Sequence, residues 1–262
     1  MDGTSQTLLL RHDEAGVATL TLNRPEQRNA LSVATMTAVQ DALDAIAKDK
    51  SVKVVVLAGA GPGFCAGHDL RELRANPGKQ YYEAVFGQCS RMMMSIVKLP
   101  QPVIARVHGI ATAAGCQLVA TCDLAVASDQ ARFATSGINV GLFCATPAVA
   151  VSRAVGRKPA MEMLLTGDFI SAAEAQRIGL VNRVVPAAEL DEAVVALARR
   201  VARQLPSAIA LGKQSFYRQV EMDLAAAYRE AGEAMVRNML ERDTEAGIDA
   251  FIDKRPPPWQ EG

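Results

Sequence analysis

Apolar and polar residues follow two different periods along this chain of 262 residues. Strand-forming residues predict strands over 7–12 and 17–22, joined by a turn at 13–16. Two mainly apolar runs, at 52–58 and 103–107, are rich in β-branched residues and predict buried strands, although Lys53 and Arg106 lie within them. The chain is therefore expected to contain a β-sheet with buried strands.

Helices are expected where apolar residues recur every three or four positions. After Ser32, a good helix N-cap, this spacing runs from Met36 to Ile46. Another helix is expected over 81–97, after a loop at 75–80. The other expected helices cover 115–121, 147–155, 159–165, 171–178, 190–205 and several pieces of 206–251, with one more strand at 180–185. No run of about eighteen apolar residues occurs, so no membrane span is predicted.

Both buried strands run into turns of very small residues and then into helices. The turn GAGPGFCAG, at 59–67, precedes a short helix, and the turn at 109–115 precedes the helix at 115–121. Exposed backbone N–H groups at a helix start carry partial positive charge, which suits a developing oxyanion. Either turn alone could be small only for packing, but two such units could converge on one carbonyl oxygen. Neither is a phosphate loop, because no Lys-Ser/Thr follows the glycines.

Several ordered motifs resemble the enoyl-CoA hydratase/isomerase (crotonase) superfamily. They are LNRPEQRNALS (22–32), FCAGHDL (64–70), HGIATAAGCQLVATCDLAVAS (108–128), FATSGINVGLF (133–143) and FISAAEAQRIGLVNRVV (169–185). The likeness covers residues 17–251. It implies an α/β fold, the crotonase (ClpP-like) spiral of ββα units with a C-terminal helical subdomain. The implied domains are a core at 1–205, with the coenzyme A and oxyanion site, and a helical oligomerisation subdomain at 206–262.

The resemblance also implies the residues of a site. The backbone N–H groups of His68 and Ala114 would form an oxyanion hole, with no chemical role required of the His68 side chain. Arg24 and Arg28 would meet coenzyme A phosphates, although two solvated loop arginines are an equal alternative. The other substrate-side positions that it implies are Ala66, Asp69, Leu70, Arg71, Phe251 and Lys254, the last two reaching the adenine end bound by a neighbouring subunit. Asp69 is interpreted mainly as a helix cap.

The chain departs from the family's hydratases at two positions. The two glutamates that deliver water in those enzymes fall at Gln117 and Gly137. A glutamine amide cannot act as a general base near neutral pH, and each acid–base group contributes about 10²- to 10⁴-fold to the rate. We therefore expect enolate stabilisation to survive and crotonyl-CoA hydration to be poor.

Three alternatives remain open for the function. The protein could be an enzyme that catalyses another reaction of an acyl-CoA thioester. One example is decarboxylation of a malonyl-type thioester, which needs an oxyanion hole but no strong base. It could be a non-catalytic acyl-CoA-binding protein. An RNA-binding relative is disfavoured, because the first helix has only Lys48 and Lys50 at its end. The polar candidates near the acyl end are Gln117, Ser136, Asn139, Cys144 and Thr146.

Composition limits the partners. Lys plus Arg and Asp plus Glu are both 28, so the net charge is zero, which argues against a nucleic-acid or membrane-surface partner. The expected ligand is an acyl-CoA substrate, with no separate cofactor and no metal site. The resemblance implies a homotrimer or a dimer of trimers.

Cysteine usage and the first residues bear on the compartment. Five cysteines are scattered in apolar runs without metal-ligand spacing, which indicates reduced thiols in a cytosolic type of compartment. MDGTSQ, residues 1–6, has no basic start and no apolar stretch, so we expect a loose segment and no signal peptide. A cytoplasmic location is predicted.

Overall fold

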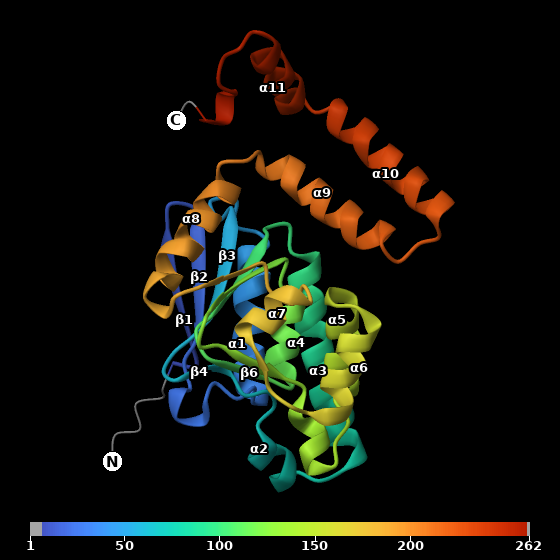
Figure 1. Cartoon of the computed structure of the whole chain (residues 1–262). Coiled ribbons are helices and arrows are strands. Elements are labelled where there is room, and N and C mark those ends of the chain that lie inside the picture. Colours follow the sequence, from blue (N-terminus) through green and yellow to red (C-terminus); the bar gives the residue numbers. More distant parts are fainter. Residues whose placement is uncertain (1–6, 261–262) are drawn as a thin grey trace.

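The computed structural model describes residues 7–260 and consists of two β-sheets, a set of surrounding helices and a C-terminal arm of three helices (Figure 1). The α/β prediction is confirmed. The expectations for residues 1–6 lie outside the described part of the chain.

The larger sheet has six strands in the order β1-β2-β3-β5-β7-β10. Their bounds are β1 Leu9–Glu14, β2 Val17–Leu22, β3 Val54–Gly59, β5 Val103–Val107, β7 Leu124–Ser128 and β10 Arg183–Val185. β1 and β2 form an antiparallel hairpin, and the other neighbours pair in parallel. All six residues of β3 are buried, as its continuous apolar run predicts. β10 is shorter than the expected strand at 180–185, because Leu180 and Val181 bond back to Ala175 in a buried turn.

The smaller sheet has four short strands in the order β4-β6-β8-β9. Their bounds are β4 Gly63–Cys65, β6 Ile110–Thr112, β8 Arg132–Ala134 and β9 Ile170–Ser171. β4 follows β3 and β6 follows β5, and the two pair in parallel. The two small-residue turns predicted from the sequence are therefore brought to neighbouring strands of one sheet.

Eleven α-helices occur among the described residues. They are α1 Val33–Ile46, α2 Leu70–Ala75, α3 Lys79–Lys98, α4 Ala114–Thr121, α5 Ala145–Ala154, α6 Arg157–Thr166, α7 Ala172–Arg177, α8 Leu190–Ala202, α9 Pro206–Gln219, α10 Leu224–Met239 and α11 Arg242–Ile252. Short 3₁₀ turns lie at Pro25–Gln27, Ser136–Val140, Ala187–Glu189 and Pro258–Gln260. Every expected helix is present. The Ser32 hydroxyl caps α1 by accepting the Thr35 N–H, as predicted.

Helices cover both faces of the larger sheet. α1 and α3 pack together on one side and contribute Met36, Leu43, Met92 and Ile96 to the main core. α8 covers the other side through Leu190 and its following turns, against β3, β5 and β7. Both faces of β3 are thus covered, which explains its unbroken hydrophobic run.

A buried ion pair fastens the C-terminal arm to the core. Lys213 of α9 donates from Nζ to the carbonyls of Ile96 and Gln101, both at 3.0 Å, and to Asp123 Oδ2 at 2.7 Å. The Tyr217 hydroxyl donates to Asp123 Oδ1 at 2.9 Å. All three protons of the ammonium group are paired, so the charge is buried with full hydrogen bonding.

Beyond α9 the arm extends away from the sheets (Figure 1). Its last two helices expose many large apolar side chains, namely Leu224, Tyr228, Met235, Val236, Met239, Leu240, Ile248, Phe251 and Ile252. No helix between residues 7 and 260 is long and apolar enough to cross a membrane.

Candidate active site

The loop over residues 23–32 is organised by a buried asparagine that the sequence analysis did not single out. Asn29 has φ +57°, and its Nδ2 donates to the carbonyls of Ala60 and Gly63, both at 2.8 Å. Its Oδ1 accepts the Arg24 N–H at 2.9 Å. The loop is thereby tied to the turn between β3 and β4. An asparagine after an arginine in a polar loop gives only a weak signal for such a role.

The same loop forms a backbone bridge with the first predicted oxyanion donor. The Leu31 N–H donates to the Gly67 carbonyl at 2.7 Å, and the Asp69 N–H donates to the Leu31 carbonyl at 3.1 Å. These bonds use the residues on either side of His68. The N–H of His68 itself has no hydrogen-bond acceptor among residues 7–260, so it is available to a ligand.

The second predicted donor lies at the first residue of α4. Ala114 has ordinary helical backbone angles, and its N–H is one of the unpaired groups of the helix N-terminus. The unusual conformation falls one residue earlier, at Ala113, with φ +51° and ψ −119°. The compatible φ that the replacement of glycine by Ala114 requires is therefore present.

The two turns are in direct contact. A Cβ atom added to Gly67, where φ is +88°, would lie 2.9 Å from the Ala113 Cβ and 3.1 Å from the Ala114 nitrogen. Only glycine fits there, both for its positive φ and for this close approach. Gly115 is packed as tightly against the Cys65 carbonyl. The glycines thus bring the two helix-start turns into one site.

A cavity of about 420 Å³ opens at these turns. The two turns contribute Ala66, His68, Ala113 and Ala114. The other lining residues are mostly apolar: Leu70, Leu73, Phe86, Ser136, Gly137, Val140, Leu142, Phe143, Cys144, Ala145, Thr146 and Pro147. Among residues 7–260, no carboxylate, lysine or arginine lines it, so it suits a neutral apolar group.

His68 lines this cavity, but both of its ring nitrogens are turned into the protein, an arrangement that the sequence did not predict. Its ring packs edge-on against Phe86, with 5.3 Å between ring centroids. Both ring nitrogens are shielded from solvent and have no hydrogen-bond partner among the described residues. Burial lowers the pKa of His68, so its imidazole is neutral at neutral pH.

The two positions of the family glutamates differ in their surroundings. Gln117 is buried on α4, its Oε1 has no partner within residues 7–260, and it does not line the cavity. Gly137 does line the cavity, and its N–H donates to Cys144 Sγ at 3.3 Å. Of the other polar candidates, Ser136, Cys144 and Thr146 line the cavity, while Asn139 bonds to the Gly167 carbonyl.

The arginines predicted for coenzyme A have different environments. Arg24 is engaged within the chain, with NH2 3.0 Å from Asp69 Oδ2 and NH1 donating to the Ala30 carbonyl at 2.8 Å. Arg28 and Arg71 are exposed. Asp69 accepts the N–H groups of the first turn of α2, which confirms its role as a helix cap.

Phe251 and Lys254 lie at the other end of the molecule. Phe251 is 83% exposed on α11, and Lys254 follows that helix. α2 contributes Leu70 and Leu73 to the cavity, and α11 lies at the opposite end of the molecule from α2 (Figure 1). The fold of one chain therefore does not bring these two residues to the site.

The five cysteines are unpaired and buried. Burial raises the pKa of Cys144, and it raises those of Cys65, Cys89 and Cys116 to about 12. None of these thiols is an activated nucleophile. Across residues 7–260, no group of three His, Cys, Asp or Glu side chains could hold a metal ion.

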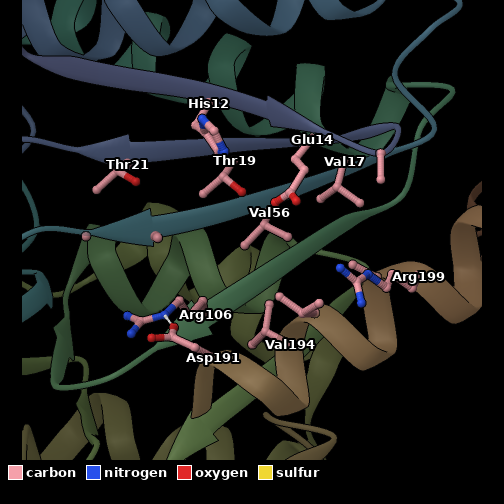
Figure 2. Close-up of a pocket in the computed structure, with 15 residues that line it drawn as sticks. His12, Glu14, Val17, Thr19, Thr21, Val56, Arg106, Asp191, Val194 and Arg199 are labelled. Atoms are coloured by element: carbon pink, nitrogen blue, oxygen red, sulfur yellow. Dashed lines mark hydrogen bonds and ion pairs between the residues drawn. The ribbon is translucent and has the colours of Figure 1, made fainter.

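A second hollow, of about 370 Å³, lies beside α8 on the sheet face that this helix covers (Figure 2). Thr19 and Thr21 of β2 and Val56 of β3 line it, and Arg106 of β5 is ion-paired there with Asp191 of α8. None of the residues predicted for the site lies in this hollow. The candidate active site is therefore the cavity at the two turns.

Sequence reasoning missed the large apolar residues of the cavity wall. Phe86 comes from α3, and Leu142 and Phe143 come from the segment before α5. Leu142 and Phe143 remain about half exposed, at 49% and 42%. An apolar Leu-Phe pair directly after a glycine was the available signal, but it does not distinguish a pocket wall from core.

Comparison with known proteins identifies the relatives of this chain. A family model described as enoyl-CoA hydratase/isomerase matches residues 12–262. The chain is 49% identical to the mitochondrial enoyl-CoA hydratase domain-containing protein 3 of Rattus norvegicus, over 93% of this chain and 81% of that protein. This agrees with the family and the fold that the motifs indicated.

Solved structures agree with this family and this fold. The crystal structure of an enoyl-CoA hydratase from Mycobacterium smegmatis superposes with a TM-score of 0.95 and 56% identity, covering 97% of this chain and 99% of the other. The crystal structure of human enoyl-CoA hydratase domain-containing protein 3 gives a TM-score of 0.94 and 47% identity, covering 97% and 100%. The crotonase fold is thus confirmed.

Proposed function

The chain belongs to the enoyl-CoA hydratase/isomerase family, and from that premise we propose that it acts on an acyl-CoA thioester by stabilising an enolate. The observation that carries the proposal is the contact between the two turns. It leaves the N–H groups of His68 and Ala114 unpaired on adjacent segments, at the wall of an apolar cavity.

In this mechanism the thioester oxygen accepts hydrogen bonds from both amides. As charge moves from the α-carbon onto that oxygen, the two bonds strengthen without any movement of the donors, because the backbone is already fixed. The start of α4 adds its helix dipole at Ala114. Each such donor is worth about 10²- to 10³-fold in rate, and the apolar walls around Phe86 and Leu142 increase the effect by excluding water.

Crotonyl-CoA hydration is not the reaction we propose. Neither Gln117 nor Gly137 supplies a carboxylate, and no other carboxylate lines the described cavity. Water addition needs one group to activate the water and one to supply a proton. No carboxylate among the described lining residues fills either role, so the expected hydratase rate is far below that of an enzyme with two glutamates.

Decarboxylation of a malonyl-type thioester is the second candidate. It is favoured by the lack of a carboxylate base, because departure of CO₂ itself generates the enolate. It ranks lower because the described lining has no Lys or Arg side chain to pair with the second carboxylate of such a substrate. A protein that binds acyl-CoA without turning it over is the third.

Coenzyme A would lie along the loop over residues 23–32, with Arg28 and Arg71 at its phosphates. Arg24 would support the loop through Asp69, since its guanidinium is already paired. No additional cofactor is included in this proposal, and the partner is a small-molecule thioester rather than nucleic acid or membrane.

Assembly into a homotrimer, or a dimer of trimers, is part of the proposal. The exposed apolar residues of α10 and α11 support it, because single chains rarely expose so many on adjacent helices. Phe251 and Lys254 would then reach the adenine end in a neighbouring subunit. The five free thiols favour a reducing compartment, for which we propose the cytoplasm, although the vertebrate relatives carry "mitochondrial" in their names.

The test is a mass-spectrometric screen of the purified full chain against crotonyl-, 3-enoyl-, malonyl-, methylmalonyl- and 3-hydroxyacyl-CoA. Rearrangement or α-proton exchange supports enolate chemistry, and loss of CO₂ supports the second candidate. Gain of one water on crotonyl-CoA, at a rate typical of hydratases, would contradict the proposal. Binding without turnover leaves the third candidate.

A further inference from the structure

The hollow beside α8 exists because one face of the larger sheet is only partly covered. Every second residue of β2 is buried in the core, and the residues between them, Val17, Thr19 and Thr21, are partly exposed on the opposite face. On that face α8 packs mainly against β3, β5 and β7. The strip over β1 and β2 is left open, and the hollow of about 370 Å³ runs along it (Figure 2).

The wall that faces the strands is one side of α8. The residues that α8 contributes recur at intervals of three and four positions, which places them together on a helix. They are Asp191, Val194, Val195, Ala198 and Arg199. Val194 and Ala198 belong to the same buried apolar cluster as Val56 of β3. The middle of the hollow, where Val56 and Val194 lie, is therefore apolar (Figure 2).

The two ends of the hollow carry charges in different states. At one end Arg106 of β5 and Asp191 of α8 form an ion pair, so these charges satisfy each other. At the other end Glu14 of β1 and Arg199 of α8 extend from facing elements (Figure 2). Glu14 lies beside Val17, its partner in the register of the hairpin.

Glu14 and Arg199 have opposite charges but do not reach each other. Neither side chain forms an ion pair or a hydrogen bond with another residue among residues 7–260. Two opposite charges thus face one space, at the end of an apolar channel. A ligand that fills this space needs a cation for Glu14, an anion for Arg199 and an apolar group attached to both.

We propose that this hollow is a binding site for a free α-amino acid with an apolar side chain, such as leucine. The ammonium group donates to the Glu14 carboxylate, and the carboxylate of the ligand accepts from the Arg199 guanidinium. The side chain of the ligand then lies over Val56 and Val194 and leaves water. No residue lines both this hollow and the cavity at the two turns, so the site is independent of the proposed function.

The charges of the hollow distinguish an amino acid from simpler ligands. A fatty acid would satisfy Arg199 but would bring a second carboxylate towards Glu14. An alkylamine would satisfy Glu14 and leave Arg199 without an anion. A zwitterion is attracted by both, and the hydroxyl groups of Thr19 and Thr21 on the floor can serve as further donors or acceptors.

The experiment is isothermal titration calorimetry of the full chain with leucine and two analogues that each lack one charge. Isocaproate lacks the ammonium group, and isoamylamine lacks the carboxylate. The variants are Glu14→Gln and Arg199→Gln, both at exposed positions. The matched controls are Glu192→Gln and Arg200→Gln, which are exposed on α8 and do not line the hollow. Thermal unfolding checks that all variants are folded.

We expect saturable leucine binding by the parent, with each analogue about 10- to 100-fold weaker. Glu14→Gln should weaken leucine by that factor and leave isocaproate unchanged, whereas Arg199→Gln should weaken leucine and leave isoamylamine unchanged. Both control variants should match the parent. Absence of saturable leucine binding up to about 10 mM would overturn the inference. So would isocaproate or isoamylamine binding as tightly as leucine, or an equal loss in the control variants.

Discussion

The N–H of Gly137 donates a hydrogen bond to Sγ of Cys144, at the position where the family resemblance places the second glutamate. A Cβ atom on Gly137 would lie 2.8 Å from that sulfur and closer still to the Leu142 carbonyl. The missing carboxylate is therefore not a simple exchange of one side chain. The Leu142 carbonyl and the Cys144 thiol close off the space that a side chain at position 137 would need.

This closure predicts that restoring the two glutamates does not restore hydration. In Gln117→Glu/Gly137→Glu the second side chain collides with backbone, and the first places a carboxylate at a position that is only 4% exposed. We expect little crotonyl-CoA hydration and a loss of several kcal/mol of unfolding free energy. Urea unfolding and a hydratase assay measure both. Gly212→Ala, on the exposed face of α9, is the control for adding a side chain to a glycine. Hydratase turnover in the double variant, at near-parental stability, would refute the packing argument.

Gly67→Ala is expected to separate the two turns. Its Cβ would crowd Ala113 and the Ala114 nitrogen, at a φ of +88° that alanine rarely adopts. Activity on whichever thioester is turned over should fall about 10²- to 10³-fold, the effect of one oxyanion donor. The ratio of kcat to KM, with stability followed in parallel, measures this. A variant that keeps full activity would show that the turns do not act together.

Ala113→Gly is expected to raise stability. Alanine at φ +51° and ψ −119° is strained, and glycine removes the clash of the Cβ with backbone. The greater freedom of glycine in the unfolded chain offsets part of this gain, so the net rise should be up to about 1 kcal/mol. Thermal unfolding tests it, and a lower Tm would mean that packing of the Ala113 methyl against Gly67 outweighs the strain.

The Lys213–Asp123 pair should be strongly coupled. Lys213→Met leaves Asp123 buried and uncompensated, and Asp123→Asn leaves the ammonium with only carbonyls. Each single change should cost about 3–5 kcal/mol, and the double change less than the sum. A double-mutant cycle by urea unfolding gives the coupling free energy. Additive costs would show that the two residues act independently.

Histidine titration predicts that the free energy of unfolding decreases as the pH falls below neutral. Burial lowers the pKa of His68 in the folded chain, so the folded state favours the neutral ring. Its contribution is complete above the unfolded pKa of about 6.5 and is lost as pH falls from there to the folded pKa. His108 shows the same direction of shift, so His68→Gln should reduce the slope without abolishing it. Unfolding free energies measured across this pH range test this, and an unchanged slope would contradict the burial of His68.

The sequence predicted the large elements because each carries its own signal. The valine-rich run of β3 and the spaced apolar residues of α1 report burial directly. The smaller sheet left no pattern, since β4 and β6 are three residues long and lie inside glycine-rich turns. Its existence followed only from the family resemblance.

Some features of the candidate site could likewise be predicted from the sequence, and others could not. The two small-residue turns before His68 and Ala114 could be placed from motifs, because glycine spacing records backbone geometry. The His68 ring and the Phe86 wall could not, since they come from segments that meet only in the fold. Loss of the glutamate at Gly137 was visible in the sequence, but the closure by Cys144 was not.

The backbone bridge between Leu31 and the residues beside His68 couples the position of the loop over residues 23–32 to that of the proposed oxyanion donor. Two hydrogen bonds transmit any displacement of the loop to the direction in which the His68 N–H points. A nucleotide held by the loop would thus reduce the fluctuations of the His68 backbone N–H. A short thioester without that nucleotide does not restrain the loop. Its turnover number should therefore fall together with its affinity.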